Sequence, residues 1–172
     1  RNDVTAEEYL EMIRLKTAVL LAASLKIGAR LGGASVEDAG RLYDFGMHVG
    51  VAFQLKDDLL DVYGNAKVFG KNIGGDILCN KKTYMLIKAL EHANADQHNQ
   101  LNSWINAETF QPAEKIAAVT ELYDRIGVKA VCENKILEYS NRAMESLAAV
   151  SIAEEKKEEL KKIIENLIHR EV

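Results

Sequence analysis

The chain has 172 residues, of which 48% are hydrophobic and 28% are charged, and these values are typical of one globular domain. Its formal net charge of -4 includes no basic excess, so nucleic acid is not expected as a partner. Two cysteines cannot form a disulfide framework and fit a reducing, cytoplasmic setting, and no apolar run is long enough for a membrane span. The single proline, Pro112, permits long uninterrupted helices.

The first predicted helix begins at a capping box. Thr5 and Glu8 are spaced so that each side chain satisfies the free backbone N–H of the other. The pattern over residues 9–31 then has a helical period and becomes almost wholly apolar in its second half. Gly32 and Gly33 are expected to end this helix.

A second, longer helix is predicted over residues 35–63. Ser35 is its expected N-cap, with Asp38 at the reciprocal position of a capping box. The middle of this helix is apolar around its whole circumference, which predicts a place in the centre of a helix bundle. Gly46 and Gly50, four residues apart, would let a neighbouring helix approach closely.

The rest of the chain is also predicted to be helical. A glycine-rich segment at 64–76 indicates a loop, and no segment alternates with period two for long enough to predict a strand. The expected helices cover residues 77–93, a short stretch around Trp104, the segment from Pro112 to Gly127, residues 128–149, and a final helix opened by a Ser151–Glu154 capping box. We therefore predict one all-α domain over residues 1–172.

Three carboxylates and an amide share one face where the second helix ends. At about 100° per residue, Asp57 and Asp61 differ by roughly 40°, and Asp58 lies within roughly 100° of both. Gln54 falls on the same side. Ligands that are all oxygen favour a hard cation, and Mg²⁺ usually binds through few carboxylates together with substrate phosphates. The cluster therefore indicates Mg²⁺ and a phosphorylated ligand, with a solvated acidic helix end as the alternative.

Basic residues accompany this acidic cluster. Lys71, Lys81 and Lys82 follow it within one loop and one helix start. Lys16 and Thr17 lie within the other apolar helix, where a buried lysine is costly and indicates an anionic partner. A lysine that extends along the helix rim into water is the alternative for Lys16.

These segments together resemble a known enzyme family. The motifs are FQLKDDLLDVYG, the Gly-Lys pair at 70–71, GGDILCNKKTY at 74–84, and KTAVLLAAS in the first helix. They are similar to the second aspartate-rich region and the Lys-Thr helix of trans-isoprenyl diphosphate synthases, which include farnesyl and geranylgeranyl diphosphate synthases. The similarity covers most of residues 9–90 and implies the isoprenoid synthase fold, an antiparallel helix bundle around a central cavity.

The resemblance also implies a reaction and its residues. An allylic diphosphate would ionise, the alkene of isopentenyl diphosphate would attack the carbocation, and a proton would be lost. The implied roles are Mg²⁺ binding by Asp57, Asp58 and Asp61, with Asp57 the best candidate for a direct ligand, diphosphate binding by Lys16, Lys71 and Lys81, and a place near the reacting carbons for Thr17 and Gln54.

One departure from the family pattern matters. The family carries a first aspartate-rich motif before the segment that resembles this chain, and no second DDxxD occurs here. We therefore expect the chain to be the C-terminal half of a synthase, inactive by itself, and homodimeric in its complete form. A terpene cyclase of the same fold and a non-catalytic partner subunit are alternatives, although the intact aspartates and lysines favour the elongating enzyme.

Overall fold

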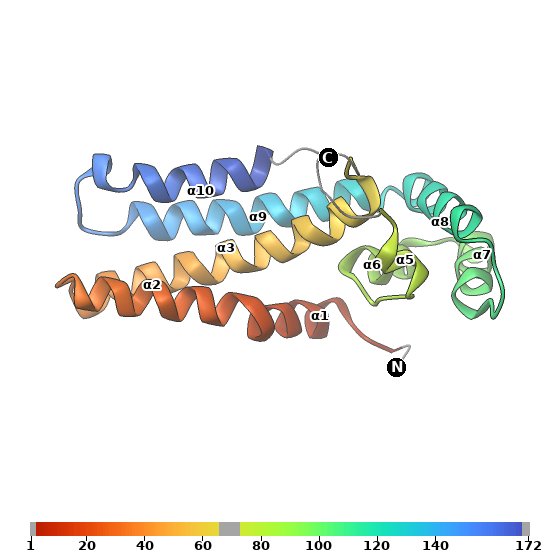
Figure 1. Ribbon diagram of the computed structural model, residues 1–172, viewed down its shortest axis with the longest axis horizontal. Helices are drawn as coiled ribbons and strands as arrows, with labels where there is room; N and C mark the ends of the chain where they lie inside the picture. Colours follow the sequence, from red (N-terminus) through yellow and green to blue (C-terminus); the bar gives the residue numbers. More distant parts are fainter. Residues whose placement is uncertain (1–2, 66–72, 170–172) are drawn as a thin grey trace. The chain divides into compact units, whose positions relative to one another are not determined.

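The computed structural model describes residues 3–65 and 73–169, and within these ranges every regular element is a helix (Figure 1). The elements are α1 Ala6–Ile13, the π-helix η1 Arg14–Ala18, α2 Val19–Leu31, α3 Val36–Tyr63, α5 Gly75–Leu78, α6 Tyr84–His92, α7 Ala95–Asn106, α8 Pro112–Ile126, α9 Val128–Ala148, the 3-10 helix η2 Glu154–Lys156 and α10 Glu158–His169. The all-α prediction is confirmed. No helix in the described part combines the length and apolarity that a membrane span requires.

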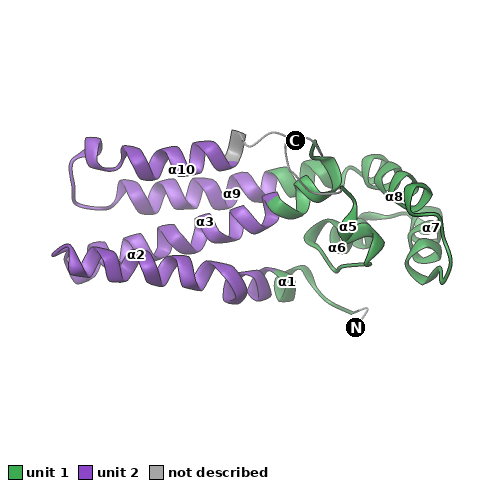
Figure 2. Ribbon diagram, in the orientation of Figure 1, with its two compact units in different colours: residues 1–9, 57–133, 171–172 green, residues 10–56, 134–170 purple. Residues whose placement is uncertain are grey.

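The helices fall into two compact units (Figure 2). In the described part, unit 1 comprises residues 3–9, 57–65 and 73–133, and unit 2 comprises residues 10–56 and 134–169. Three helices, α1, α3 and α9, begin in one unit and end in the other, so the chain passes between the units inside helices. The single domain over residues 1–172 stays a prediction.

Unit 2 is built on a close approach between α2 and α3. A Cβ atom added to Gly46 would lie 2.7 Å from the Cα of Ala22, and one added to Gly50 would lie 2.5 Å from the Cα of Ala18. Both distances are far inside van der Waals contact, so only glycine permits this packing. The predicted role of the two glycines is confirmed.

The core of unit 2 joins α3 to α9 and α10. Its buried residues are Phe45, Val49, Ala143, Leu147 and Ile164, and Figure 2 shows the segments that carry them running side by side. On another side of α3, Phe53 is 42% exposed. The prediction that α3 is buried around its whole circumference is therefore wrong at this position within unit 2.

Of the two capping predictions in unit 2, the cap at Ser35 is confirmed and the box at Ser151 is not. Ser35 caps α3, since its Oγ accepts the backbone N–H of Asp38 at 3.0 Å. The Asp38 carboxylate, however, accepts the backbone N–H of Ser151 at 3.0 Å. This bond takes the donor that Glu154 would need for the predicted box, and α10 begins only at Glu158. The Ser151–Glu154 capping box is therefore wrong.

The start of the first helix agrees with the sequence analysis, but its interior does not. The Thr5 backbone N–H donates to Glu8 Oε2 at 3.0 Å, and the Glu8 N–H donates to Thr5 Oγ1 at 3.2 Å, so this capping box is confirmed. The predicted continuous helix over 9–31 is interrupted by the π-helix η1. Single π turns of this kind occur often at functional sites.

In unit 1, α8 packs against α5, α6 and α7. Pro112 opens α8, and Gly127 ends it with φ +83, as predicted. The predicted helix over 77–93 is wrong, because α5 and α6 are separate. The chain turns at Asn80, which has φ +50, and Thr83 starts α6 by accepting the Leu86 N–H at 3.3 Å. Most of the predicted glycine-rich loop, residues 66–72, lies outside the described residues.

Candidate functional site

The acidic end of α3 lies in unit 1 and contains one deeply buried carboxylate. The Asp58 side chain is 1% exposed, and its oxygens accept hydrogen bonds from the Lys81 ammonium, at 3.0 Å, and from the Tyr9 hydroxyl. Burial raises the pKa of Asp58, although both donors favour the charged form and act against that rise. Burial, and after it the contact with Asp58, raises the pKa of the Tyr9 hydroxyl, which keeps it a proton donor.

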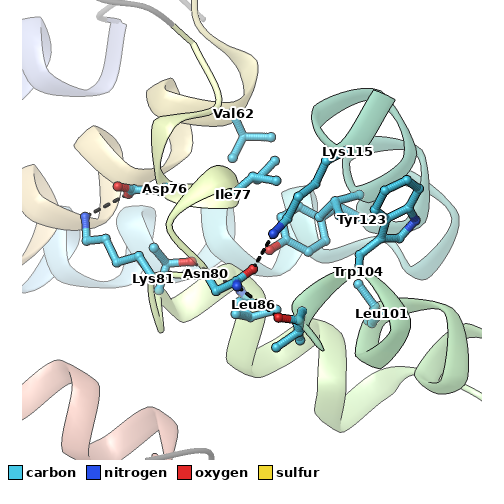
Figure 3. Close-up of a pocket in the computed structure, with 13 residues that line it drawn as sticks. Val62, Asp76, Ile77, Asn80, Lys81, Leu86, Leu101, Trp104, Lys115 and Tyr123 are labelled. Carbon is cyan, nitrogen blue, oxygen red and sulfur yellow. Dashed lines mark hydrogen bonds and ion pairs between the residues drawn. The ribbon is translucent and has the colours of Figure 1, made fainter. Parts of the chain in front are cut away.

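Lys81 joins two acids of unit 1. Its Nζ lies 3.0 Å from Asp58 Oδ1 and 2.7 Å from Asp76 Oδ2, and its side chain is 41% exposed (Figure 3 draws the Asp76 pair). Burial alone would lower the pKa of this ammonium, but the two carboxylates outweigh it, and the net direction is upward. Lys81 is therefore a permanent cation at the surface end of the cluster.

Asp61 connects α3 to the segment that carries Asp76. Its Oδ2 accepts the backbone N–H of Asp76 at 2.8 Å, and its backbone carbonyl accepts the N–H of Gly74 at 2.6 Å. Gly74 has φ +85, and an added Cβ would lie 2.7 Å from the Ile116 side chain. Burial raises the pKa of Asp61, and the bond from Asp76 opposes this. The Asp76 segment is thus held against the end of α3 by backbone contacts.

The donor chemistry of the acidic cluster fits Mg²⁺. In residues 3–65 and 73–169, no group of three or more His, Cys, Asp and Glu side chains is placed so that it could hold a metal ion. Asp58 and Asp61 accept hydrogen bonds from protein donors, whereas Asp57 is partly exposed. Mg²⁺ needs only one or two protein carboxylates when a substrate supplies phosphate oxygens, so this finding does not conflict with the predicted role of Asp57, which stays a prediction.

Unit 2 brings together two other predicted residues. The Thr17 hydroxyl, on η1, donates to Gln54 Oε1 on α3 at 2.8 Å. Thr17 also lines a largely apolar groove of about 370 Å³, together with residues of α2, α3 and α10; its other lining residues are Leu21, Val49, Gly50, Phe53, Ile163, Asn166 and Leu167. The pair therefore places a polar contact at the wall of an apolar groove.

The remaining predicted lysines differ in their placement. Lys16 neighbours Thr17 on η1 and is exposed, so the expectation of a buried lysine is wrong, and the alternative of a lysine that extends into water agrees with the structure. Lys71 lies outside the described residues. The structure thus brings together Asp58, Asp61 and Lys81 in unit 1 and Thr17 with Gln54 in unit 2.

Two residues of the acidic cluster had no predicted role. Asp76 stands in the GGDILCNKKTY segment, and its place five residues before Lys81 was an available signal. Tyr9 is separated from Asp58 by 49 positions, and no local pattern connects them.

Comparison with known proteins assigns the family. A family model described as polyprenyl synthetase matches residues 1–123, which include the end of α3, Lys81 and the Thr17–Gln54 pair. The chain belongs to the polyprenyl synthetase family. The resemblance drawn from the sequence motifs is thereby confirmed.

Individual members of the family align along nearly the whole chain. It is 36% identical to the short chain isoprenyl diphosphate synthase of Methanothermobacter thermautotrophicus, over 99% of this chain and 51% of that protein. It is 30% identical to the (2E,6E)-farnesyl diphosphate synthase of Mycobacterium tuberculosis, over 99% of this chain and 48% of that protein. The chain therefore spans about half the length of the curated relatives it matches.

Solved structures of polyprenyl synthetase relatives confirm the fold. A crystal structure of a geranylgeranyl pyrophosphate synthase has a TM-score of 0.92 and 36% identity, covering 100% of this chain and 54% of that one. A geranylgeranyl pyrophosphate synthase from Corynebacterium glutamicum, solved with isoprenyl diphosphate and magnesium, has a TM-score of 0.87 and 29% identity, covering 98% of this chain and 48% of that one. The isoprenoid synthase fold predicted from the motifs is confirmed.

Proposed function

We propose that this protein is a Mg²⁺-dependent trans-prenyltransferase that condenses isopentenyl diphosphate with an allylic diphosphate to give a longer polyprenyl diphosphate. Membership of the polyprenyl synthetase family supports the reaction class. The observation that carries the proposal is the ion-paired group of Asp58, Lys81 and Asp76, which lies beside Asp57 and Asp61 at the end of α3. A homodimer and a cytoplasmic location belong to the same proposal.

Lys81 is suited to bind an anionic ligand while it keeps its protein contacts. An ammonium group has three N–H donors, and the two carboxylates use two of them. The third donor and the 41% exposure of the side chain leave Lys81 able to contact a diphosphate oxygen. In our proposal Lys16 and Lys71 add further positive charge to the same ligand.

The three aspartates at the end of α3 have different roles in this proposal. Asp57 is the direct metal ligand, and Asp58 and Asp61 support it while they hold Lys81 and the Asp76 segment. Mg²⁺, when bound, would neutralise the negative charge that grows on the diphosphate as it leaves. Because Asp58 is buried and already bonded twice, its carboxylate orients the lysine more rigidly than a solvated acid would.

The proposed reaction exchanges one bond for another. The C–O bond of the allylic diphosphate breaks, a C–C bond forms to the terminal alkene carbon of isopentenyl diphosphate, and the released pyrophosphate accepts the proton that is lost. Thr17 and Gln54 lie near the reacting carbons in this proposal. The apolar groove that Thr17 lines would shelter a carbocation from water.

The test uses the full-length protein with dimethylallyl diphosphate and radiolabelled isopentenyl diphosphate, with and without Mg²⁺. We expect labelled products longer by five-carbon units only with Mg²⁺, and an Asp57→Ala rate lower by about a hundredfold. Asp44→Ala, at an exposed acid of the same helix, is the matched control and should keep the rate. Unchanged turnover in Asp57→Ala would remove the metal role. Pyrophosphate release from geranyl or farnesyl diphosphate without isopentenyl consumption would indicate a cyclase, and pyrophosphate binding without turnover would indicate a non-catalytic subunit.

A further inference from the structure

Lys115, on α8 of unit 1, is a buried lysine outside the set of residues assigned to the reaction. It is 1% exposed, and in the described part of the chain it forms no ion pair with a carboxylate. Its Nζ donates to Asn80 Oδ1 at 2.7 Å and lies 4.2 Å from the centre of the Phe110 ring. A buried ammonium is costly unless its contacts offset the loss of water, so a lysine at this position calls for an explanation.

Its partner Asn80 has a strained backbone. With φ +50, Asn80 is the non-glycine residue with positive φ in the described ranges. Its side chain is bonded at both ends, because Nδ2 donates to the Ile105 carbonyl at 3.0 Å and Oδ1 accepts from Lys115. Asparagine tolerates this left-handed conformation better than most residues, and two bonds to its amide hold it there.

The turn at Asn80 separates two side chains that point in opposite directions. Figure 3 shows Asn80 directed toward Lys115, whereas the next residue, Lys81, is directed toward Asp76. The backbone of Lys81 also donates to the Asp76 carbonyl at 3.0 Å. Because the two contacts are made by consecutive residues, the backbone conformation of Asn80 determines where the Lys81 side chain begins.

The space around Lys115 excludes a ligand. The cavity that Lys115 and Asn80 share with Trp104 and Tyr123 has a volume of about 20 Å³ (Figure 3), which holds about one water molecule. A diphosphate or a metal with its ligands would not fit there. Lys115 is thus placed to act on Asn80 and not on a bound molecule.

We propose that Lys115 is a positioning residue which, through the amide of Asn80, fixes the left-handed turn that directs Lys81 at Asp58 and Asp76. This inference rests on the proposed function, in which Lys81 binds the substrate diphosphate. It adds to that function a residue on a different helix that determines how well the lysine is presented.

The experiment compares Lys115→Met, Asn80→Gly and the double variant in the full-length protein. Methionine keeps the volume of the lysine stem, and glycine keeps positive φ without the amide. We measure the affinity for inorganic pyrophosphate with Mg²⁺ by calorimetry, and amide hydrogen exchange over residues 79–83 by mass spectrometry. Lys88→Met is the control, because Lys88 is also a lysine of unit 1 near an aromatic ring but pairs with Glu91.

We expect each single variant to bind pyrophosphate about fivefold more weakly, the size of effect that one hydrogen bond produces. The double variant should bind pyrophosphate at most about twofold more weakly than either single variant, because both changes break the same connection. Exchange over residues 79–83 should be faster in all three, and Lys88→Met should match the wild type. With the allylic diphosphate, KM should rise while kcat changes little, a split that general destabilisation would not produce.

Three results would overturn the proposal. The first is a double variant whose fold-loss of pyrophosphate affinity equals the product of the two single losses, since Lys115 would then act independently of Asn80. The second is unchanged exchange over residues 79–83 in Lys115→Met. The third is unchanged pyrophosphate affinity in Lys115→Met when Lys81→Met weakens it. If Lys81→Met itself leaves pyrophosphate binding intact, the proposed role of Lys81 fails, and the exchange data alone decide whether Lys115 fixes the turn. Circular dichroism of every variant confirms that it folds.

Discussion

The hydroxyl of Tyr9 donates a hydrogen bond to the carboxylate of Asp58, which lies 49 positions later in the chain, and both residues are almost fully buried. Tyr9 stands near the start of α1 and Asp58 near the end of α3, so this bond joins two helix ends within unit 1. It leaves Asp58 with a neutral donor on one oxygen and the Lys81 ammonium on the other. The two donors fix the orientation of the buried Asp58 carboxylate, and the carboxylate therefore holds the Lys81 ammonium in one position.

Tyr9→Phe should lower the free energy of unfolding by about 1–3 kcal/mol, because the buried Asp58 carboxylate loses a donor that nothing replaces. Urea denaturation at pH 7 measures this loss. Tyr43→Phe is the control, because the ring of Tyr43, and not its hydroxyl, contacts Lys26. Its expected change is below about 0.5 kcal/mol. Equal losses in the two variants would mean that the Tyr9 hydroxyl does not stabilise Asp58.

Asp38→Asn tests the pH dependence of unit 2. The bond from the Ser151 N–H, opposed by burial and assisted by Arg41, holds the pKa of Asp38 below its ordinary 3.8. A lowered pKa in the folded state contributes stability above the ordinary value, and this contribution is lost as the pH falls through the lowered pKa. The wild type should therefore exceed Asp38→Asn in unfolding free energy at pH 7, and the gap should close as the pH falls below 3.8.

Denaturant titrations at several pH values measure that gap. Asp44→Asn is the control, since Asp44 is an exposed acid of the same helix and should show a small gap at every pH. A gap for Asp38→Asn that stays constant down to the acid-unfolded range would show that the charge of Asp38 is not what the Ser151 contact stabilises.

Gly50→Ala should destabilise the protein by about 1–3 kcal/mol, because the new methyl group would meet the backbone of Ala18. Gly40→Ala on the same helix has open space around its Cβ and should raise stability by up to about 1 kcal/mol through helix propensity. Thermal or urea unfolding of both variants measures whether each substitution lowers or raises the free energy of unfolding. A stabilising Gly50→Ala would contradict the close approach of α2 and α3.

The sequence predicted the features of the fold that depend on neighbouring residues. The Thr5–Glu8 capping box, the start of α8 at Pro112 and its end at Gly127 each depend on contacts within one helical turn. Residues 80–83 are all polar, but no glycine or proline stands there to signal a turn, so the break at Asn80 is not predicted by the local pattern. The bonds that hold Asn80 come from Lys115 and Ile105, far along the chain. Local periodicity contains no information about such partners.

The candidate site likewise contains features that local sequence predicts and features that depend on contacts between distant residues. The grouping of Asp57, Asp58 and Asp61 follows from helical geometry, so their shared face could be predicted. The burial of Asp58 and its bond to Tyr9 could not, because they depend on how α1 meets the end of α3. The Thr17–Gln54 bond joins residues 37 positions apart, and only the resemblance to a known family had placed these two residues in one region.

Thr17→Val should lower kcat by about tenfold in the full-length protein, because Gln54 Oε1 loses its donor at the wall of the groove and a lost bond of this kind is worth roughly one factor of ten. Thr17→Ser keeps a hydroxyl and should recover most of the lost rate. Ser24→Ala, on the exposed side of α2, is the control and should leave kcat unchanged, since its hydroxyl bonds only to its own helix. Steady-state turnover with isopentenyl and geranyl diphosphates measures all three. If Thr17→Ser loses as much rate as Thr17→Val, the methyl group of Thr17 and its packing in the groove, and not the hydroxyl bond to Gln54, would account for its role.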